Sequence, residues 1–265
     1  MNFCNIQVQF PVLYSTTLSK EMNNYEKQIG YELDFWKMEL MKKPSMLGNL
    51  ATKVQTKINS YIPTKVHKAI TVTIKQMVKA VLFGSTYTTS AMPDNSISLL
   101  HREALVKAKI ESYSKTGAAE GGITGAGGFL MSMADFPILI GIKMKMLFEI
   151  AALYGYDVKD YRERLYILHI FQLAFSSKTG TQNVFKQIQN WDQKLIILPE
   201  SAENFDWQTF QQEYRDYIDL AKLAQLLPVV GAAVGAVANY QLIKKLGKSA
   251  MMAYRMREES LKTKD

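Results

Sequence analysis

Apolar residues recur at intervals of three and four positions along most of the chain, which is the spacing of one face of an α-helix. Two clear stripes of this kind lie within residues 29–40 and 66–81. No segment shows a convincing alternation of apolar and polar residues between turn signals, as half-buried β-strands do. The pattern therefore predicts an all-α protein.

Residues that start and stop helices divide this pattern into about eight to ten helices. Pro44 ends the first helix, a second is expected over residues 45–61, and Pro63 allows a third to begin. Asp94 is placed to cap a helix that runs to about residue 113. Gly155 ends a later helix, and Asp160 begins the next, with Glu163 completing a capping-box pattern. No linker is long or polar enough to require two domains.

The predicted organisation has three parts. Residues 1–21 lack helical periodicity and are expected to form a flexible arm, residues 22–257 form the single compact helical domain, and residues 258–265 form a charged tail. The arm contains the one cysteine, Cys4, so no internal disulfide is possible, and no secretory signal is evident. These features favour a cytoplasmic protein.

Six glycines lie within "GAAEGGITGAGGF", residues 117–129. A P-loop requires Gly-Lys-Ser/Thr after its first glycine, and a dinucleotide-binding loop requires Gly-x-Gly-x-x-Gly after a strand. No lysine follows a glycine in this run, and the position that would need the third glycine is Leu130. The residues therefore exclude both types of phosphate loop.

The glycines instead repeat at intervals of four residues, and a second set near the end of the chain does the same. These helix-packing glycines are Gly117, Gly121, Gly125, Gly231 and Gly235. Small residues four apart lie on one face of a helix and let another helix approach closely. We expect the two Gly/Ala-rich strips to pack in one core, and contact of the two strips with each other is one arrangement of that core. Gly127 and Gly128 are expected to form a loop before a helix that begins near Asp135.

The net charge of +8 is unevenly distributed, because no acidic residue occurs between Glu39 and Asp94, whereas eight lysines do. Lysine without arginine suits a diffuse anionic surface such as lipid headgroups better than nucleic acid, whose readers rely on arginine. The alternative is an ordinary solvated helix face. The candidate membrane-surface residues are Lys53, Lys57, Lys65, Lys68, Lys75 and Lys79.

Residues 223–243 contain no charged side chain, and 21 residues are enough to span a bilayer. The segment nevertheless includes Pro228, two glutamines and an asparagine, and it is rich in alanine. The mean hydropathy of the chain is −0.10. A buried helix is favoured over a membrane span, and insertion stays open as the second interpretation.

Chemical motifs are scarce. The three histidines are scattered, His169 is expected in the core, and neither a Gly-x-Ser-x-Gly elbow nor a His-Glu-x-x-His motif occurs, so no metal and no cofactor are expected. Glu149 follows Lys145 by one turn, and a buried carboxylate with a basic partner can act as a general base. A structural role for the same residues is the competing interpretation. The candidate catalytic cluster is Asp135, Lys145, Glu149, Asp157 and Arg164.

Three motifs in this chain are shared with a bacterial family. They are the glycine run followed by "ADFPILIGIKMKMLFEIAALYGYD" at residues 134–157, and "LLPVVGAAVGAVANYQLIKKLGKSA" at residues 226–250. In these features the chain, from about residue 22 to 257, resembles the EcsC family. The resemblance implies an association with an ABC transporter, since the family is named after the third product of an operon that also encodes one. It supplies no catalytic residues.

The function that these observations favour is a non-enzymatic helical protein that binds anionic lipid at the inner face of the membrane through its lysine-rich face. Two alternatives remain open at this point. One is a hydrolase of a small or lipid-derived substrate that uses Asp135 and Glu149, and the other is an adaptor for a transporter or another protein. No nucleic-acid partner is expected.

Overall fold

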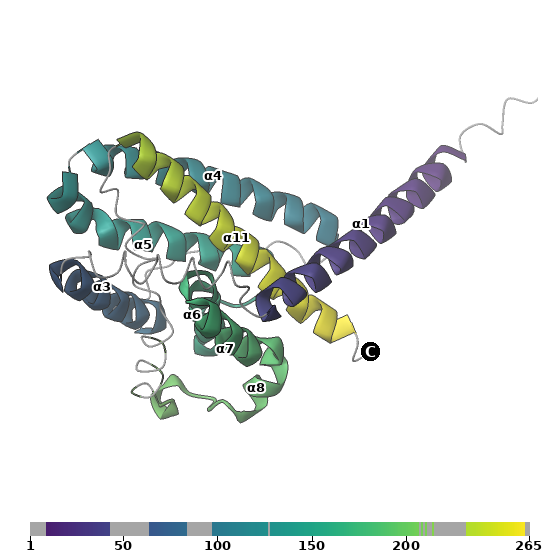
Figure 1. Ribbon diagram of the computed structural model, residues 1–265. Helices are drawn as coiled ribbons and strands as arrows, with labels where there is room; N and C mark the ends of the chain where they lie inside the picture. The colour runs from purple at the N-terminus through teal and green to yellow at the C-terminus, as the bar shows by residue number, and fades with distance from the viewer. Residues whose placement is uncertain are drawn as a thin grey trace, which may run out of the picture.

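The computed structural model describes residues 9–42, 64–83, 97–126, 128–206, 208, 210, 214 and 232–262. Within these residues the chain forms eight α-helices, one short 3-10 helix and no β-strand (Figure 1). The prediction of an all-α fold is therefore confirmed. The helices are α1 (Gln9–Met41), α3 (Thr64–Phe83), α4 (Leu99–Ala126), α5 (Gly128–Leu153), α6 (Tyr161–Phe175), α7 (Lys178–Gln189), α8 (Trp191–Ile197), η1 (Ala202–Asn204) and α11 (Ala232–Lys262).

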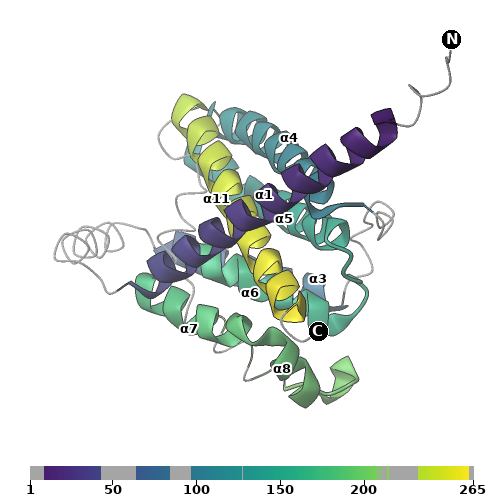
Figure 2. The ribbon, with the colours of Figure 1, turned by 90° about the vertical axis from the view of Figure 1, so that its right-hand side faces the viewer.

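Helices α4 and α11 form the most extensive contact between any two of the described helices. They run in opposite directions, because the end of α4 meets the start of α11 and the start of α4 meets the end of α11 (Figures 1 and 2). At one end Gly121 faces Gly235, and at the other Glu103 bonds to Arg255. Both helices of this antiparallel pair pack against α5, and α11 also packs against α6.

The glycine run is helical and forms the contact surface of α4. A Cβ atom added to Gly121 would lie 2.7 Å from the carbonyl oxygen of Gly235, and one added to Gly117 would collide with the side chain of Ile243. The close approach of the α11 backbone therefore requires glycine at position 121, whereas a side chain at position 117 would have to displace the end of the Ile243 side chain. Gly125 belongs to α4, although its surroundings are not described, and Gly231 lies outside the described residues.

Helix α5 begins earlier than the sequence predicted. It starts at Gly128, so the expectation of a loop at Gly128 and of a helix beginning near Asp135 is wrong. Asp135 is not a helix cap but lies within α5, as does Pro137. Glycine is a poor helix former by about 1 kcal/mol relative to alanine. Packing of α5 against α4 offsets that local preference, and sequence periodicity does not report such packing.

The end of α5 follows the predicted pattern. Gly155 has a φ of 87°, in the left-handed region that glycine adopts most easily. Its amide donates to the carbonyl of Ala152, and the next amide, that of Tyr156, donates to the carbonyl of Ala151. These two bonds form a Schellman motif, which closes the helix and directs the chain into α6.

Helix α6 lies in the centre of the molecule, and 13 of its 15 residues are buried. Asp160 caps it by accepting a hydrogen bond from the backbone amide of Arg162, as predicted. Glu163 does not complete a capping box. It is buried instead, where it accepts hydrogen bonds from Tyr254 at 2.7 Å and from Arg257 at 2.6 Å.

Both ends of the described chain are more helical than expected. Helix α1 begins at Gln9, so most of the segment assigned to a flexible arm is helix, and its first half projects away from the other helices (Figures 1 and 2). Helix α11 continues to Lys262, and two residues assigned to the charged tail make ion pairs. Glu258 pairs with Arg102 at 3.5 Å and Glu259 with Lys37 at 2.5 Å. The helix expected over residues 45–61 lies outside the described residues.

The last turns of α11 connect three other helices through two arginines. Arg255 donates to Glu103 on α4 at 2.7 Å and to Glu32 on α1 at 2.8 Å. Arg257 pairs with Glu163 on α6, and its guanidinium lies over the ring of Tyr156 at 3.8 Å. Glu103 is fully buried, so its charge is compensated within the protein rather than by water.

Candidate functional site

Helix α3 presents a line of basic residues on its outer side. Lys68, Lys75 and Lys79 are exposed, and Val72 between them is 46 % exposed. Their spacing of four, three and four residues places all four side chains along one side of the helix. The opposite side packs into the core through the buried residues Ile70, Ile74, Met77, Val78 and Val81.

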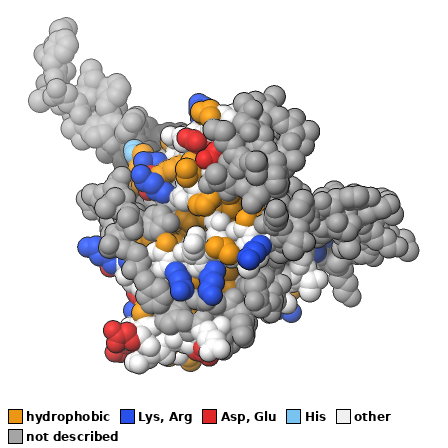
Figure 3. Space-filling model, turned by 90° about the vertical axis from the view of Figure 1, so that its left-hand side faces the viewer, with side chains coloured by type: hydrophobic (Ala, Val, Ile, Leu, Met, Phe, Trp, Pro, Cys, Tyr) orange, Lys and Arg blue, Asp and Glu red, His pale blue; other side chains and the backbone are white. Residues whose placement is uncertain are grey.

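None of these three lysines has an ion-pair partner among the described residues. Figure 3 shows the side of the molecule on which α3 lies, where a row of basic side chains borders an apolar area. Lys65 belongs to the same helix, but its side chain is not described, and Lys53 and Lys57 lie outside the described residues. The outer side of the described part of α3 is therefore a positively charged surface that also contains apolar side chains.

The five candidate catalytic residues do not gather in one place. Asp135 and Glu149 are 14 residues apart on the same helix, which separates them by about 21 Å along its axis. Asp157 is exposed beyond the end of α5 and accepts a hydrogen bond from the amide of Lys159. Arg164 donates to the carbonyl oxygens of Val158 and Val81 and so connects α6 with α3. The predicted acid–base cluster is thus not assembled.

Glu149 is buried, but its basic partner is not the one that helical spacing indicated. Lys145 is exposed, and the ammonium of Lys109 on α4 lies 2.9 Å from Glu149 Oε2. The other carboxylate oxygen accepts a hydrogen bond from the hydroxyl of Tyr113 at 2.8 Å. Burial, and then this carboxylate, raise the pKa of Tyr113, so the phenol stays protonated and donates. These contacts connect α4 and α5.

Lys143 is a buried amine that was not among the residues predicted from the sequence. It is fully buried beneath the α4–α11 contact, and its Nζ donates to the carbonyl of Leu139 at 3.2 Å and to Oδ1 of Asn239 at 3.1 Å. Burial lowers the pKa of Lys143 to about 7. A signal was present in the sequence, because position 143 falls on the same helical face as the apolar Leu139 and Leu147.

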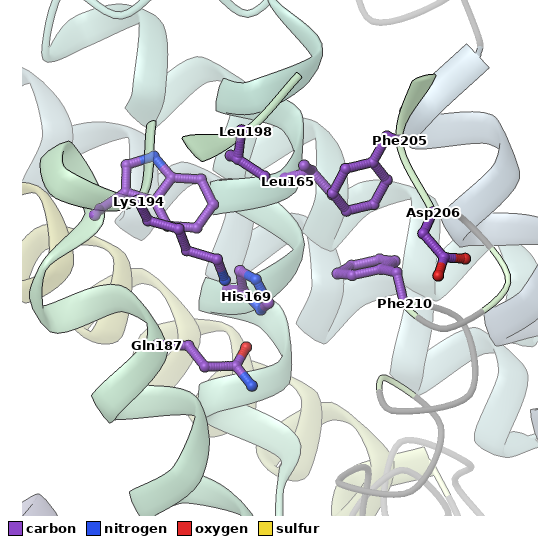
Figure 4. Close-up of a pocket in the computed structure, with 9 residues that line it drawn as sticks. Leu165, His169, Gln187, Lys194, Leu198, Phe205, Asp206 and Phe210 are labelled. Atoms are coloured by element: carbon purple, nitrogen blue, oxygen red, sulfur yellow. The ribbon is translucent and has the colours of Figure 1, made fainter. Parts of the chain in front are cut away.

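A cavity of about 350 Å³ lies between α6, α8 and the segment that follows α8 (Figure 4). His169 and Leu165 of α6 form its floor, and Trp191 and Lys194 of α8 form one side. Phe205 and Phe210 face these residues from the opposite side (Figure 4). His169 is buried in aromatic surroundings, as predicted, with Trp191 and Phe210 at ring distances of 5.5 and 5.6 Å. No pattern in the sequence predicted the cavity, since its residues come from separate segments.

The described residues contain no group of three or more histidine, cysteine, aspartate or glutamate side chains arranged to hold a metal ion. Over the same part of the chain, each helix is too short or too polar to cross a bilayer. Of the uncharged segment 223–243, the structure describes only residues 232–243, which form the first part of α11.

Comparison with known proteins agrees with the motifs noted in the sequence. Residues 27–258 match the model of the EcsC protein family. The chain is 47% identical to Protein EcsC of Bacillus subtilis (strain 168) over 222 residues, which are 84% of this chain and 91% of that protein. It is also 32% identical over 146 residues to the uncharacterized protein YdbA of the same organism, with 54% of each chain covered. No solved structure matches at a significant level. The chain therefore belongs to the EcsC protein family.

Proposed function

We propose that this protein docks peripherally on anionic membrane surfaces through the outer side of α3. The observation that carries the proposal is the line of Lys68, Lys75 and Lys79, which are exposed and have no ion-pair partner among the described residues. A lysine near an anionic bilayer surface contributes about 1 kcal/mol of binding free energy. Three such residues therefore provide about 3 kcal/mol, enough for reversible association.

The apolar residues on this side support the same orientation. Val72, which is 46 % exposed, lies within the lysine line. An interfacial surface combines basic side chains that meet headgroups with apolar ones that enter the headgroup region. Docking on the inner leaflet would also bring the protein close to membrane complexes such as the ABC transporter that the family association implies. The hydrolase alternative has less support, because Asp135 and Glu149 lie far apart on one helix.

Co-sedimentation with vesicles tests this proposal. We expect binding to vesicles with anionic lipid, no binding to neutral vesicles, and release at high salt, since salt screens surface charge within a Debye length of about 10 Å at 0.1 M. Changing Lys68, Lys75 and Lys79 together to glutamate should abolish binding.

A matched control reverses the same number of exposed lysines elsewhere, at Lys159, Lys186 and Lys248. This control has the same net charge as the α3 variant and should retain most of the binding. Equal loss in both variants would show that net charge alone is responsible, and binding that persists in the α3 variant would refute docking through α3. Salt-resistant binding would indicate insertion of an apolar segment instead.

A further inference from the structure

A groove separates α1 from the end of α11 at the point where the two helices cross (Figures 1 and 2). Ile29 and Leu33 of α1 and Leu99 of α4 line it with apolar surface, and its volume is about 230 Å³. A dry cavity of about 150 Å³ can hold a benzene ring, whereas sites for drug-sized molecules measure about 300–1,000 Å³. The groove therefore has room for one large apolar side chain of a partner rather than for a drug-sized ligand.

Gly30 keeps this groove open. It lies in the interior of α1, where glycine is a poorer helix former than alanine. A Cβ atom added to Gly30 would meet no atom within 4 Å, so packing within this chain does not require glycine there, in contrast to Gly121. Glycine at this position instead lets an occupant from outside the chain lie directly against the backbone of α1.

The rim of the groove is acidic. Glu26 and Glu259 are exposed, and Glu258 is half-buried. Glu259 pairs with Lys37 at 2.5 Å, and Glu258 pairs with Arg102 at 3.5 Å. A carboxylate accepts up to about four hydrogen bonds, so an ion pair of this kind does not prevent it from accepting from a further cation.

The basic side chains around the groove do not neutralise it. Arg255 lies beneath the floor, and its guanidinium is held by Glu103 and Glu32, so it presents no cation to an occupant. The lining and the charged side chains linked to it include more carboxylates than cations. The carboxylates are Glu26, Glu32, Asp34, Glu103, Glu258 and Glu259, and the cations are Lys37, Arg102, Lys107 and Arg255. Because the whole chain carries +8, this negative region is a local departure that favours a basic partner.

We propose that this groove binds a basic segment of a partner protein through one apolar side chain. That side chain, such as leucine, lies against Gly30 and Leu33, and lysine or arginine residues on either side of it meet the carboxylates of the rim. The groove lies on a different side of the molecule from α3 (Figure 1), so the partner binds in the absence of any membrane.

Calorimetric titration of the full chain with three capped peptides, without vesicles, tests the proposal. The peptides are Lys-Lys-Leu-Lys-Lys, Lys-Lys-Ser-Lys-Lys and Glu-Glu-Leu-Glu-Glu, which separate the effect of the apolar side chain from that of charge. We expect the first peptide to bind at least about tenfold more tightly than the second, a difference of about 1.4 kcal/mol, and the acidic peptide not to bind detectably. Failure of the first peptide to bind, or equal binding of the first peptide and either of the others, would overturn the proposal.

A variant at Gly30 tests whether the leucine of the peptide enters the groove. Gly30→Leu fills the groove and should weaken binding of Lys-Lys-Leu-Lys-Lys at least about tenfold. Gly141→Leu on α5 is the matched control, because a Cβ added there also meets nothing within 4 Å, and it should leave the affinity unchanged. Circular dichroism verifies that both variants are folded. Unchanged affinity in Gly30→Leu would refute the groove as the binding site.

Variants of the rim test the contribution of charge. Glu258→Gln combined with Glu259→Gln should weaken binding of the same peptide about tenfold. The control combines Glu200→Gln with Glu203→Gln, which removes two exposed carboxylates elsewhere and gives the same net charge, and it should bind as the unaltered protein does. Equal affinities in the two double variants would refute recognition of the peptide by the rim.

Discussion

Replacing the buried Lys143 with methionine should change how the stability of the protein depends on pH. In the unfolded chain this amine keeps its proton up to about pH 10.5, whereas in the folded protein burial lowers its pKa to about 7. Between these values the unfolded state binds one more proton than the folded state. The free energy of unfolding therefore rises with pH in this interval, by about 1.4 kcal/mol per unit.

The size of the effect follows from that pKa. The contribution of Lys143 to the free energy of unfolding is smallest below about pH 7 and becomes about 4 kcal/mol more favourable by pH 10. Methionine has no proton to lose, so Lys143→Met should gain stability relative to the unaltered protein near neutral pH. That advantage should shrink by about 4 kcal/mol between pH 7 and 10.

Urea unfolding followed by far-ultraviolet circular dichroism at several pH values in this range measures the difference between the two proteins. The other titrating groups, including the buried tyrosines, largely cancel in this comparison. Lys145→Met is the matched control, because Lys145 is exposed on the same helix and its replacement should give a difference that does not depend on pH. A pH-independent difference for Lys143→Met as well would refute the conclusion that the buried amine is neutral above pH 7.

Two further changes test the helix contacts. Gly121→Ala should destabilise the protein by about 1–3 kcal/mol, because the added methyl group overpacks the contact with α11. Gly30→Ala should stabilise it by up to about 1 kcal/mol, because a Cβ added there meets nothing within 4 Å. Thermal unfolding compares the two variants, and equal effects would contradict the close contact of α4 with α11. Arg255→Met should lower the free energy of unfolding by about 3–5 kcal/mol, because it leaves the fully buried Glu103 without its cation. Urea titration measures this loss, and a loss below about 1 kcal/mol would contradict the conclusion that Arg255 compensates a buried charge on Glu103.

Helical periodicity was enough to predict the fold class and several element ends. The core stripe of α3, the cap at Asp160 and the end of α5 at Gly155 all depend on residues within a few positions of one another. Local preference predicts a loop at Gly128, because glycine is unfavourable in a helix, whereas the structure has Gly128 as the first residue of α5. Packing of α5 against the preceding helix α4 offsets that preference, and a pattern of single residues contains no record of such packing.

In the candidate site too, the sequence predicted features that depend on residues of one helix and missed features that depend on contacts between helices. The exposed lysines of α3 follow from spacing on one helix, so the sequence indicated which residues share a side. The basic partner of Glu149 could not be predicted from spacing, because spacing indicated Lys145, which is near in sequence, whereas Lys109 is the lysine that lies near in space. The cavity around His169 and Trp191 could not be predicted either, since α6 and α8 enclose it together with the chain that follows.

The central position of α11 has a consequence for how the protein is made. This helix contacts α1, α4, α5 and α6, yet it leaves the ribosome after all of them (Figure 2). Until then, the glycine face of α4 and the carboxylates of Glu103 and Glu163 have no partners from α11. Contacts between residues so far apart in sequence form slowly, and incomplete chains expose apolar surface until α11 has been synthesised. The nascent protein should therefore depend on chaperones until α11 is made, and a stop codon before Ala232, which removes α11, should yield degradation products rather than a shorter folded protein.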